Sequence, residues 1–144
     1  MGSIKGKVNL NGLNRFQKSL SKMNGAERQQ FTEAAVKELA ARLLRKVKLR
    51  TPVGVYAKST GKKGGTLRRN WTVGNVQKRG SEYTIEVFNP VHYAPYVEFG
   101  HRTRNHQGWV DGKFMMTISE QELQNDAPRF LMDKLNSFMG GMFK

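Results

Sequence analysis

The residues best suited to chemistry lie between positions 92 and 106. This stretch holds the three histidines of the chain, His92, His101 and His106, and one carboxylate, Glu98, among aromatic side chains. A buried Glu98 could serve as a general base, and with the histidines it could act in a small nuclease or toxin. No second carboxylate or nucleophile stands at a fixed spacing nearby, and the histidines match no zinc pattern. We therefore predict no catalytic, metal or cofactor site, and no enzyme.

A structural role explains Glu98 more simply. Its carboxylate can pair with Arg102, or it can accept hydrogen bonds from a backbone turn. The neighbours that we expect to be largely core, with one tyrosine near an interface, are Tyr93, Tyr96, Val97 and Phe99. Gly100 can adopt a positive φ, which predicts an abrupt end to the segment. Residues 92–100 should thus form a short helical turn that locks a helix to a sheet.

The charge of the chain indicates a second kind of chemistry, since the net charge is +14. Residues 1–80 hold nineteen basic and three acidic residues, a net of +16, whereas residues 81–144 hold six basic and eight acidic residues, a net of −2. So uneven a distribution indicates a polyanionic partner or an acidic protein surface. The candidate contacts, in or beside two polar loops, are Lys58, Lys62, Lys63, Arg68, Arg69, Arg102 and Arg104.

Two interpretations of the arginine pair at positions 68 and 69 remain open. The pair precedes Trp71, and cations beside an aromatic ring are typical of surfaces that bind nucleic acid. Alternatively, a strand places one arginine in solvent and the other across from Glu86. The nearby sequence GKKGGT does not have the Walker spacing, so it predicts no nucleotide site.

The elements that must position these residues begin with a helix over residues 24–50. Asn24 and Glu27 have the spacing of a capping box, and Thr51-Pro52 ends the helix. Its apolar stripe repeats every four residues: Phe31, Ala35, Leu39, Leu43 and Val47. Before it, the pattern predicts an edge strand at 4–10 and a shorter helix between Leu13 and Met23.

The rest of the sequence predicts a small sheet and a second helix. Apolar residues alternate over 67–88 and predict a hairpin that turns at 78–81, and residues 113–119 predict a third strand. Residues 53–65 and 101–113 should form flexible loops, the second with a tight turn at 109–112.

The C-terminal part should be a helix in two pieces. Ser119 and Glu122 form a second capping-box pattern, so one piece should cover 120–126. Pro128 should then force a kink and a restart capped by Asp126. Gly140-Gly141 should end it.

Taken together, the patterns predict one α+β domain over residues 1–144, with frayed termini. A long N-terminal helix and a C-terminal helix pack on a small, mostly antiparallel sheet. The chain has no cysteine, no signal-peptide pattern and no apolar run long enough to span a membrane. We therefore expect no disulfide and no membrane association.

Three motifs in order resemble those of a bacteriophage protein family. They are GTLRRNW at 65–71, YAPYVEFGHRT at 93–103 and APRFLMDKL at 127–135. The chain resembles the gene-ten-like neck and tail-completion proteins of the HK-ninety-seven type. It departs from their pattern at His101, where the family usually has threonine, and in the last motif, where proline and arginine are exchanged.

The resemblance implies a structural protein of a phage or prophage. Such a protein would complete the tail and join it to the head, within a ring of copies in the virion neck or upper tail. Its partners would be other neck and tail proteins, such as the head–tail connector and the tail terminator, and the DNA passing through the channel. It would occupy the host cytoplasm during assembly. The alternative function is a nucleic-acid-binding module without sequence preference, which would use the basic N-terminal half.

Overall fold

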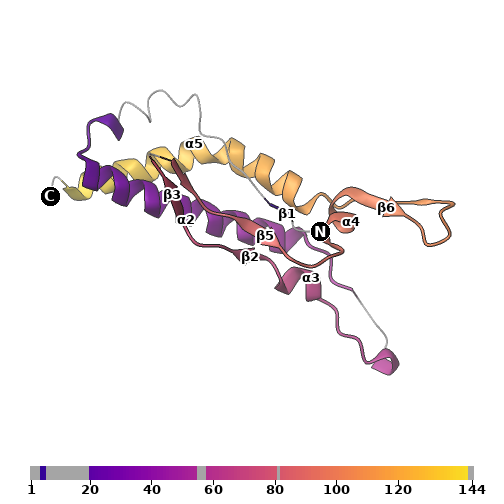
Figure 1. Cartoon of the computed structure of the whole chain (residues 1–144). Coiled ribbons are helices and arrows are strands. Elements are labelled where there is room, and N and C mark those ends of the chain that lie inside the picture. The colour runs from indigo at the N-terminus through magenta and orange to yellow at the C-terminus, as the bar shows by residue number, and fades with distance from the viewer. Residues whose placement is uncertain (1–3, 6–19, 55–57, 81, 143–144) are drawn as a thin grey trace.

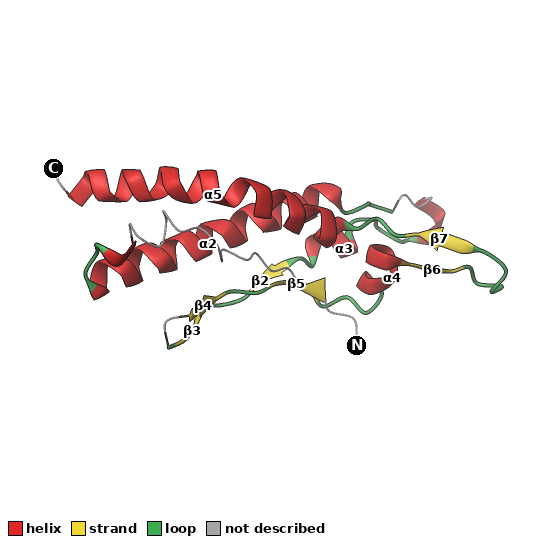
Figure 2. Cartoon of the chain, turned by 90° about the horizontal axis from the view of Figure 1, so that it is seen from above, coloured by secondary structure: helices red, strands yellow, loops and turns green. Residues whose placement is uncertain are grey.

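Two long antiparallel helices form the body of the molecule, and short strands run along one side (Figures 1 and 2). This arrangement comes from a computed structural model, which describes residues 4–5, 20–54, 58–80 and 82–142. The helices are α2 (Gly25–Arg50) and α5 (Met115–Met142). The predicted α+β class, with an N-terminal and a C-terminal helix packed on small antiparallel sheets, is confirmed.

Helix α2 forms where the sequence predicts it. The Asn24 side chain accepts a hydrogen bond from the Glu27 N–H at 2.8 Å, and the Glu27 carboxylate accepts one from the Asn24 N–H at 3.3 Å. This capping box satisfies backbone donors that have no partner within the helix. The predicted stripe from Phe31 to Val47 is buried. The strand predicted at 4–10 appears only as β1 (Ile4–Lys5), and its other residues, with most of the helix predicted after Leu13, lie outside the described part.

Helix α5 differs from the prediction. It is continuous, so the strand predicted at 113–119, the break before Pro128 and the end at Gly140-Gly141 are all wrong. Residues buried at helical spacing along it explain the result: Met115, Met116, Ser119, Leu123, Ala127, Leu131 and Leu135. Because helices in proteins gain most of their stability from packing an apolar face, that face outweighs a local proline and two glycines.

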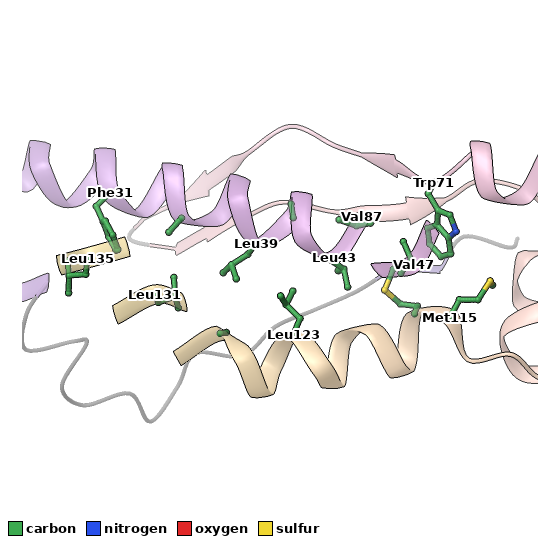
Figure 3. Close-up of a cluster of buried hydrophobic side chains, with 14 of the residues drawn as sticks. Phe31, Leu39, Leu43, Val47, Trp71, Val87, Met115, Leu123, Leu131 and Leu135 are labelled. Carbon is green, nitrogen blue, oxygen red and sulfur yellow. The ribbon is translucent and has the colours of Figure 1, made fainter. Parts of the chain in front are cut away.

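The core lies mainly between α2 and α5, and Trp71 and Val87 extend it toward the strands (Figure 3). The rings of Phe31 and Phe138 meet edge to face, with 5.6 Å between their centroids. This contact joins the start of α2 to the last turns of α5, so the two helices are antiparallel along their length.

The strands form three small antiparallel sheets rather than one. The first has the order β1-β5-β2, the second pairs β3 with β4, and the third pairs β6 with β7. Their bounds are β2 Thr72–Val73, β3 Gln77–Arg79, β4 Glu82–Thr84, β5 Val87–Asn89, β6 Gly100–Arg102 and β7 Trp109–Asp111. The predicted hairpin is therefore present over 72–89, and Gly80, with φ 59°, lies at its turn. The first residues of the hairpin predicted over 67–88 instead belong to helix α3 (Thr66–Arg69).

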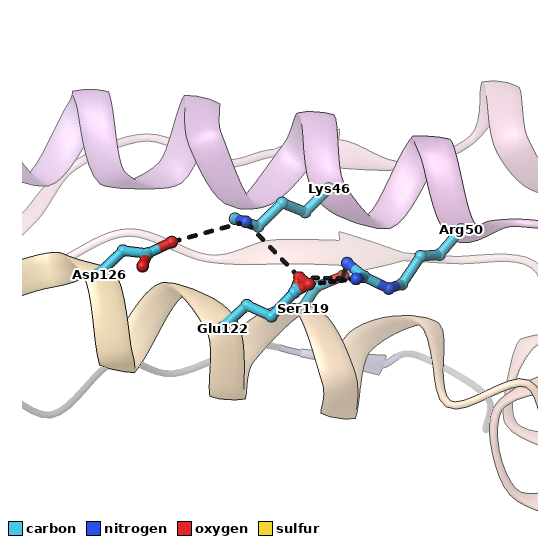
Figure 4. A network of polar contacts seen from close by, with 5 residues as sticks. All are labelled: Lys46, Arg50, Ser119, Glu122 and Asp126. Atoms are coloured by element: carbon cyan, nitrogen blue, oxygen red, sulfur yellow. Dashed lines mark hydrogen bonds and ion pairs between the residues drawn. The ribbon is translucent and has the colours of Figure 1, made fainter.

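A polar network joins the C-terminal half of α2 to the first turns of α5 (Figure 4). The Arg50 guanidinium donates to Glu122 Oε2 at 2.6 Å and to Ser119 Oγ at 3.3 Å. Ser119 and Glu122 thus bind across to α2, and the capping box predicted for them is wrong. The Arg50 hydrogen bonds, with added attraction from Lys46, lower the pKa of Glu122. A hydrogen bond from Lys134 similarly lowers the pKa of Glu38.

This network predicts a loss of stability in acid. A carboxyl group whose pKa is lowered by folding stabilises the protein above its unfolded pKa of about 4.5, and that contribution disappears as the pH falls through the lower folded pKa. The Tm of Glu122→Gln should therefore lie below the wild-type Tm at about pH 7, with the difference shrinking toward about pH 3. Thermal unfolding followed by circular dichroism across this range checks it. Glu82→Gln, at an exposed position, is the control; a pH-independent Glu122→Gln deficit would contradict the prediction.

Candidate functional site

The stretch with the most unusual chemistry folds into α4 (Ala94–Phe99) followed directly by the β6–β7 hairpin. Gly100 joins them with φ 90°, so the predicted abrupt end is confirmed. A Cβ on Gly100 would lie 2.6 Å from the Val110 carbonyl oxygen and 2.9 Å from the Trp109 ring. Only glycine fits at this crossing. The tight turn predicted at 109–112 is wrong, because Trp109–Asp111 is strand β7, paired with β6.

Glu98 is fully buried and binds the first turn of α5. One carboxylate oxygen accepts the Met116 N–H at 2.8 Å, and the other accepts the Thr117 N–H at 3.0 Å and the Thr117 hydroxyl at 2.8 Å. The carboxylate thus satisfies two donors that helix geometry leaves free, at the end where the helix dipole favours negative charge. Of the two structural roles predicted, capping of a backbone turn is correct and pairing with Arg102 is not.

Of the four residues predicted to be largely core, only Tyr93 and Val97 pack against the core. Ala94 and Glu98, four residues apart, take the buried face of α4, and Tyr93 and Val97 are half-buried beside it. Tyr96 and Phe99 then fall on the opposite face, three residues apart, and both are exposed. The prediction is wrong for Tyr96 and Phe99, because the fully buried position on α4 belongs to the Glu98 carboxylate instead of to an aromatic ring.

Phe114, the residue before α5, and Ile118, in the first turn of α5, continue this exposed surface. The fractional exposures are 55% for Tyr96, 57% for Phe99, 39% for Phe114 and 41% for Ile118. The Phe99 and Phe114 rings meet edge to face, with 6.4 Å between their centroids. We call these four residues the apolar patch. Sequence reasoning missed Phe114 and Ile118 as part of this surface, because it assigned 113–119 to a strand.

The backbone of Phe114 is strained. Its φ is 47°, in the left-handed region, where residues other than Gly, Asn and Asp are rarely found. Residues held in such conformations typically cost about 1–3 kcal/mol and occur often at functional sites. The Phe114 N–H donates to the Glu98 carbonyl at 3.0 Å, so the strained residue is fixed where α4 meets α5.

Two of the candidate cations hold the fold together. The Arg68 guanidinium donates to the Thr51 carbonyl at 2.7 and 3.2 Å, which caps the C-terminal end of α2. Arg69 donates to the Gly64 carbonyl at 2.9 Å and to the Thr66 hydroxyl. Neither of the two interpretations left open for this pair describes these bonds, since residues 66–69 are a helix instead of a strand.

The other candidate cations fall on two separate projections of the molecule (Figure 1). Lys62 and Lys63 are exposed on the segment that follows the short 3-10 helix η1 (Lys58–Thr60). Arg102 and Arg104 are exposed on the β6–β7 hairpin. The structure therefore does not gather all seven candidates into one surface.

The described residues contain no group of three or more His, Cys, Asp or Glu that could hold a metal ion. His92 lies against Tyr93 and His101 against Tyr96, so these histidines contact rings instead of one another. Within the part of the chain that is described, no helix is long and apolar enough to cross a membrane.

Comparison with protein families gives one match that bears on this site. The family model for HK97-gp10-like proteins, described as "Bacteriophage HK97-gp10, putative tail-component", matches residues 14–100. The match covers α2, α3, the strands β2 to β5 and α4, and it ends at Gly100, the first residue of β6. Strand β1, the rest of the β6–β7 hairpin and α5 lie outside it. Comparison with curated proteins and with solved structures gave no match. Because the model matches more than half of the chain, the chain belongs to this phage tail-component family.

Proposed function

We propose that this tail-component family member completes the tail of a phage or prophage and joins it to the head. In this role it acts in the neck or upper tail, as one copy in a ring that contacts the connector and the tail terminator. It is a structural protein of the virion and not an enzyme, and it passes through the host cytoplasm during assembly. The family match over residues 14–100 carries this proposal.

The geometry supports a role in which this protein binds other proteins. Glu98, the best candidate for a catalytic carboxylate, has both oxygens bound to the start of α5. The molecule also projects the β6–β7 hairpin from one end (Figure 2). The aromatic side chains of Tyr96 and Phe99, just before this hairpin in the chain, are exposed. Exposed apolar surface of this kind commonly marks a site of protein association.

A nucleic-acid role for the basic half is the second candidate. Lys37, Arg45 and Lys48 lie along α2 away from its buried stripe, and no ion pair involves them in the described part of the chain. Cations of this kind can contact backbone phosphates without sequence preference. In a tail, the same surface would face either DNA in the channel or acidic protein.

A phage that lacks this gene should produce full heads apart from tails, or tails with abnormal upper ends. Electron microscopy of the lysate is the measurement, and the gene supplied from a plasmid is the control, which should restore joined particles. Normal infectious particles without the gene would refute the proposal and favour the nucleic-acid role. Charge removal at Arg68 is a poor substitute test, because this residue also caps α2.

A further inference from the structure

We propose that the β6–β7 hairpin and the apolar patch together bind an acidic groove on a neighbouring protein of the neck or tail. The inference rests on the proposed function for the place of that neighbour in the virion, and it names the surface that makes the contact. Among the described residues, the exposed large apolar side chains all lie at one end of the molecule, where α2 ends and α5 begins. They are Leu49, Val53, Tyr96, Phe99, Trp109, Val110, Phe114 and Ile118.

The projecting hairpin carries an apolar side chain on each of its two faces (Figure 2). Trp109 lies opposite Arg102 in the pairing of β6 with β7, and Val110 lies opposite His101. Successive side chains of a strand point to opposite faces, so Trp109 and Val110 lie on different faces. Their exposed fractions are 60% and 42%. A flat partner would cover only one face, whereas a groove that receives the hairpin would cover both.

The apolar patch adjoins the base of this hairpin. A Cβ on Gly100 would lie 2.9 Å from the Trp109 ring, so the indole covers the residue that follows Phe99. The Phe99 ring meets the Phe114 ring, and the Ile118 N–H donates to the Phe114 carbonyl one turn further along. A partner therefore meets an apolar surface that runs from the hairpin to the first turn of α5.

The loop at the tip of the hairpin is held in one shape by its own hydrogen bonds. The Thr103 N–H donates to the Gly108 carbonyl at 3.0 Å, and the Gly108 N–H donates to the Thr103 hydroxyl at 3.0 Å. That hydroxyl donates to the Asn105 amide oxygen at 2.6 Å. A pre-organised segment loses less conformational entropy when it binds. The hairpin can therefore enter a groove without refolding.

The charge around this surface indicates an acidic partner. Arg102, Arg104 and Lys113 are exposed and form no ion pair among the described residues. Asp111 is the only carboxylate in residues 99–119, so these cations outnumber it. Carboxylates beside the groove would be complementary to them. Tryptophan, tyrosine and arginine are also the residue types most enriched where a few side chains dominate the binding energy of a protein interface.

A second copy of this chain and DNA both fit this surface less well. Each copy has a net charge of +14, so copies repel one another. Glu82 lies opposite Arg79, and Asp126 lies 3.9 Å from Lys46, so these exposed carboxylates are not free of cations. Interfaces with DNA are more polar than those between proteins, and DNA would leave the exposed aromatic and aliphatic side chains without apolar contacts.

Site-specific photo-crosslinking in cells that assemble the particles tests the proposal. The full-length protein carries benzoylphenylalanine in place of Trp109 or Val110, one position on each face of the hairpin. Both positions should crosslink to the same phage protein, identified by mass spectrometry, and its net charge at neutral pH should be negative. Asn136, which is exposed near the other end of α5, is the matched control position and should give no adduct with that protein.

A charge reversal tests the attraction directly. In the protein with the crosslinker at Val110, Arg102→Glu should lower the yield of the adduct about tenfold, as expected for losing a residue that dominates the contact. Arg129→Glu makes the same change of charge at an exposed position of α5 outside this surface and should leave the yield unchanged.

The identity of the adduct decides between the possible partners. No adduct at the hairpin, an adduct between two copies of this chain, a nuclease-sensitive adduct with DNA, or a yield that Arg102→Glu does not change would each overturn the proposal. Failure of the proposed function gives a different result. An acidic partner from outside the neck and tail would support the binding surface but refute the tail role. Loss of head–tail joining in the phage that lacks the gene, without an adduct at the hairpin, would refute only the surface.

Discussion

Glu98→Gln should lower the free energy of unfolding by about 3 kcal/mol, because buried donors left without an acceptor cost about 1–3 kcal/mol and more when a charge is involved. Glutamine keeps the size of the side chain but presents an NH₂ group to one of its two partners. The N–H of Met116 or the N–H and hydroxyl of Thr117 would then face another donor. The favourable interaction of the charge with the helix dipole would also be lost.

Urea denaturation measures the predicted change, and hydrogen exchange locates it. The amides of Met116 and Thr117 should exchange faster in Glu98→Gln, whereas those in the middle of α2 should keep their relative protection. Glu82→Gln, which changes an exposed carboxylate, should alter the free energy of unfolding by less than about 0.5 kcal/mol. Unchanged protection at Met116 and Thr117 would show that the Glu98 carboxylate does not hold the start of α5.

The Glu98 contact also shows where sequence reasoning stops. The sequence shows a lone carboxylate among aromatic residues and supports capping of a backbone turn as one of its roles. It does not show that the turn begins 17 residues later, at Met115, because no local pattern connects the two positions. The same gap explains why residues 113–119 were assigned to a strand. Their cap comes from α4, and the local Ser119–Glu122 signal indicates the wrong start.

Local patterns succeed where the cause is local. The Asn24–Glu27 capping box and the four-residue apolar repeat predict α2 almost to the residue, since both depend on neighbours along one helix. Local patterns could not predict which residues of α4 are buried. A six-residue helix has no repeated period, and the identity of its buried face depends on the position of α5. The candidate cations were found by composition, but only the fold shows that Arg68 is bound to Thr51.

Trp71→Ala should destabilise the protein by about 3–5 kcal/mol, the cost usual for removing a large buried aromatic side chain. Trp71 is buried where α2 ends and the strands begin (Figure 3). Its indole N–H donates to the Thr51 hydroxyl at 2.6 Å, and that hydroxyl donates to the Val47 carbonyl at 2.5 Å. The Thr51 carbonyl accepts the Arg68 guanidinium, so a single residue connects the sheet, α3 and the last turn of α2.

Two smaller changes separate the hydrogen bond from the packing. Trp71→Phe keeps a buried six-membered ring but removes the N–H donor and the five-membered ring that carries it, while Thr51→Val leaves the indole N–H buried without an acceptor, which costs about 1–3 kcal/mol. The double variant should be more stable than the sum of the single changes predicts, because it leaves no buried donor unpaired. Chemical denaturation of the four proteins gives this coupling energy. Strictly additive changes would mean that Trp71 stabilises this junction by packing alone.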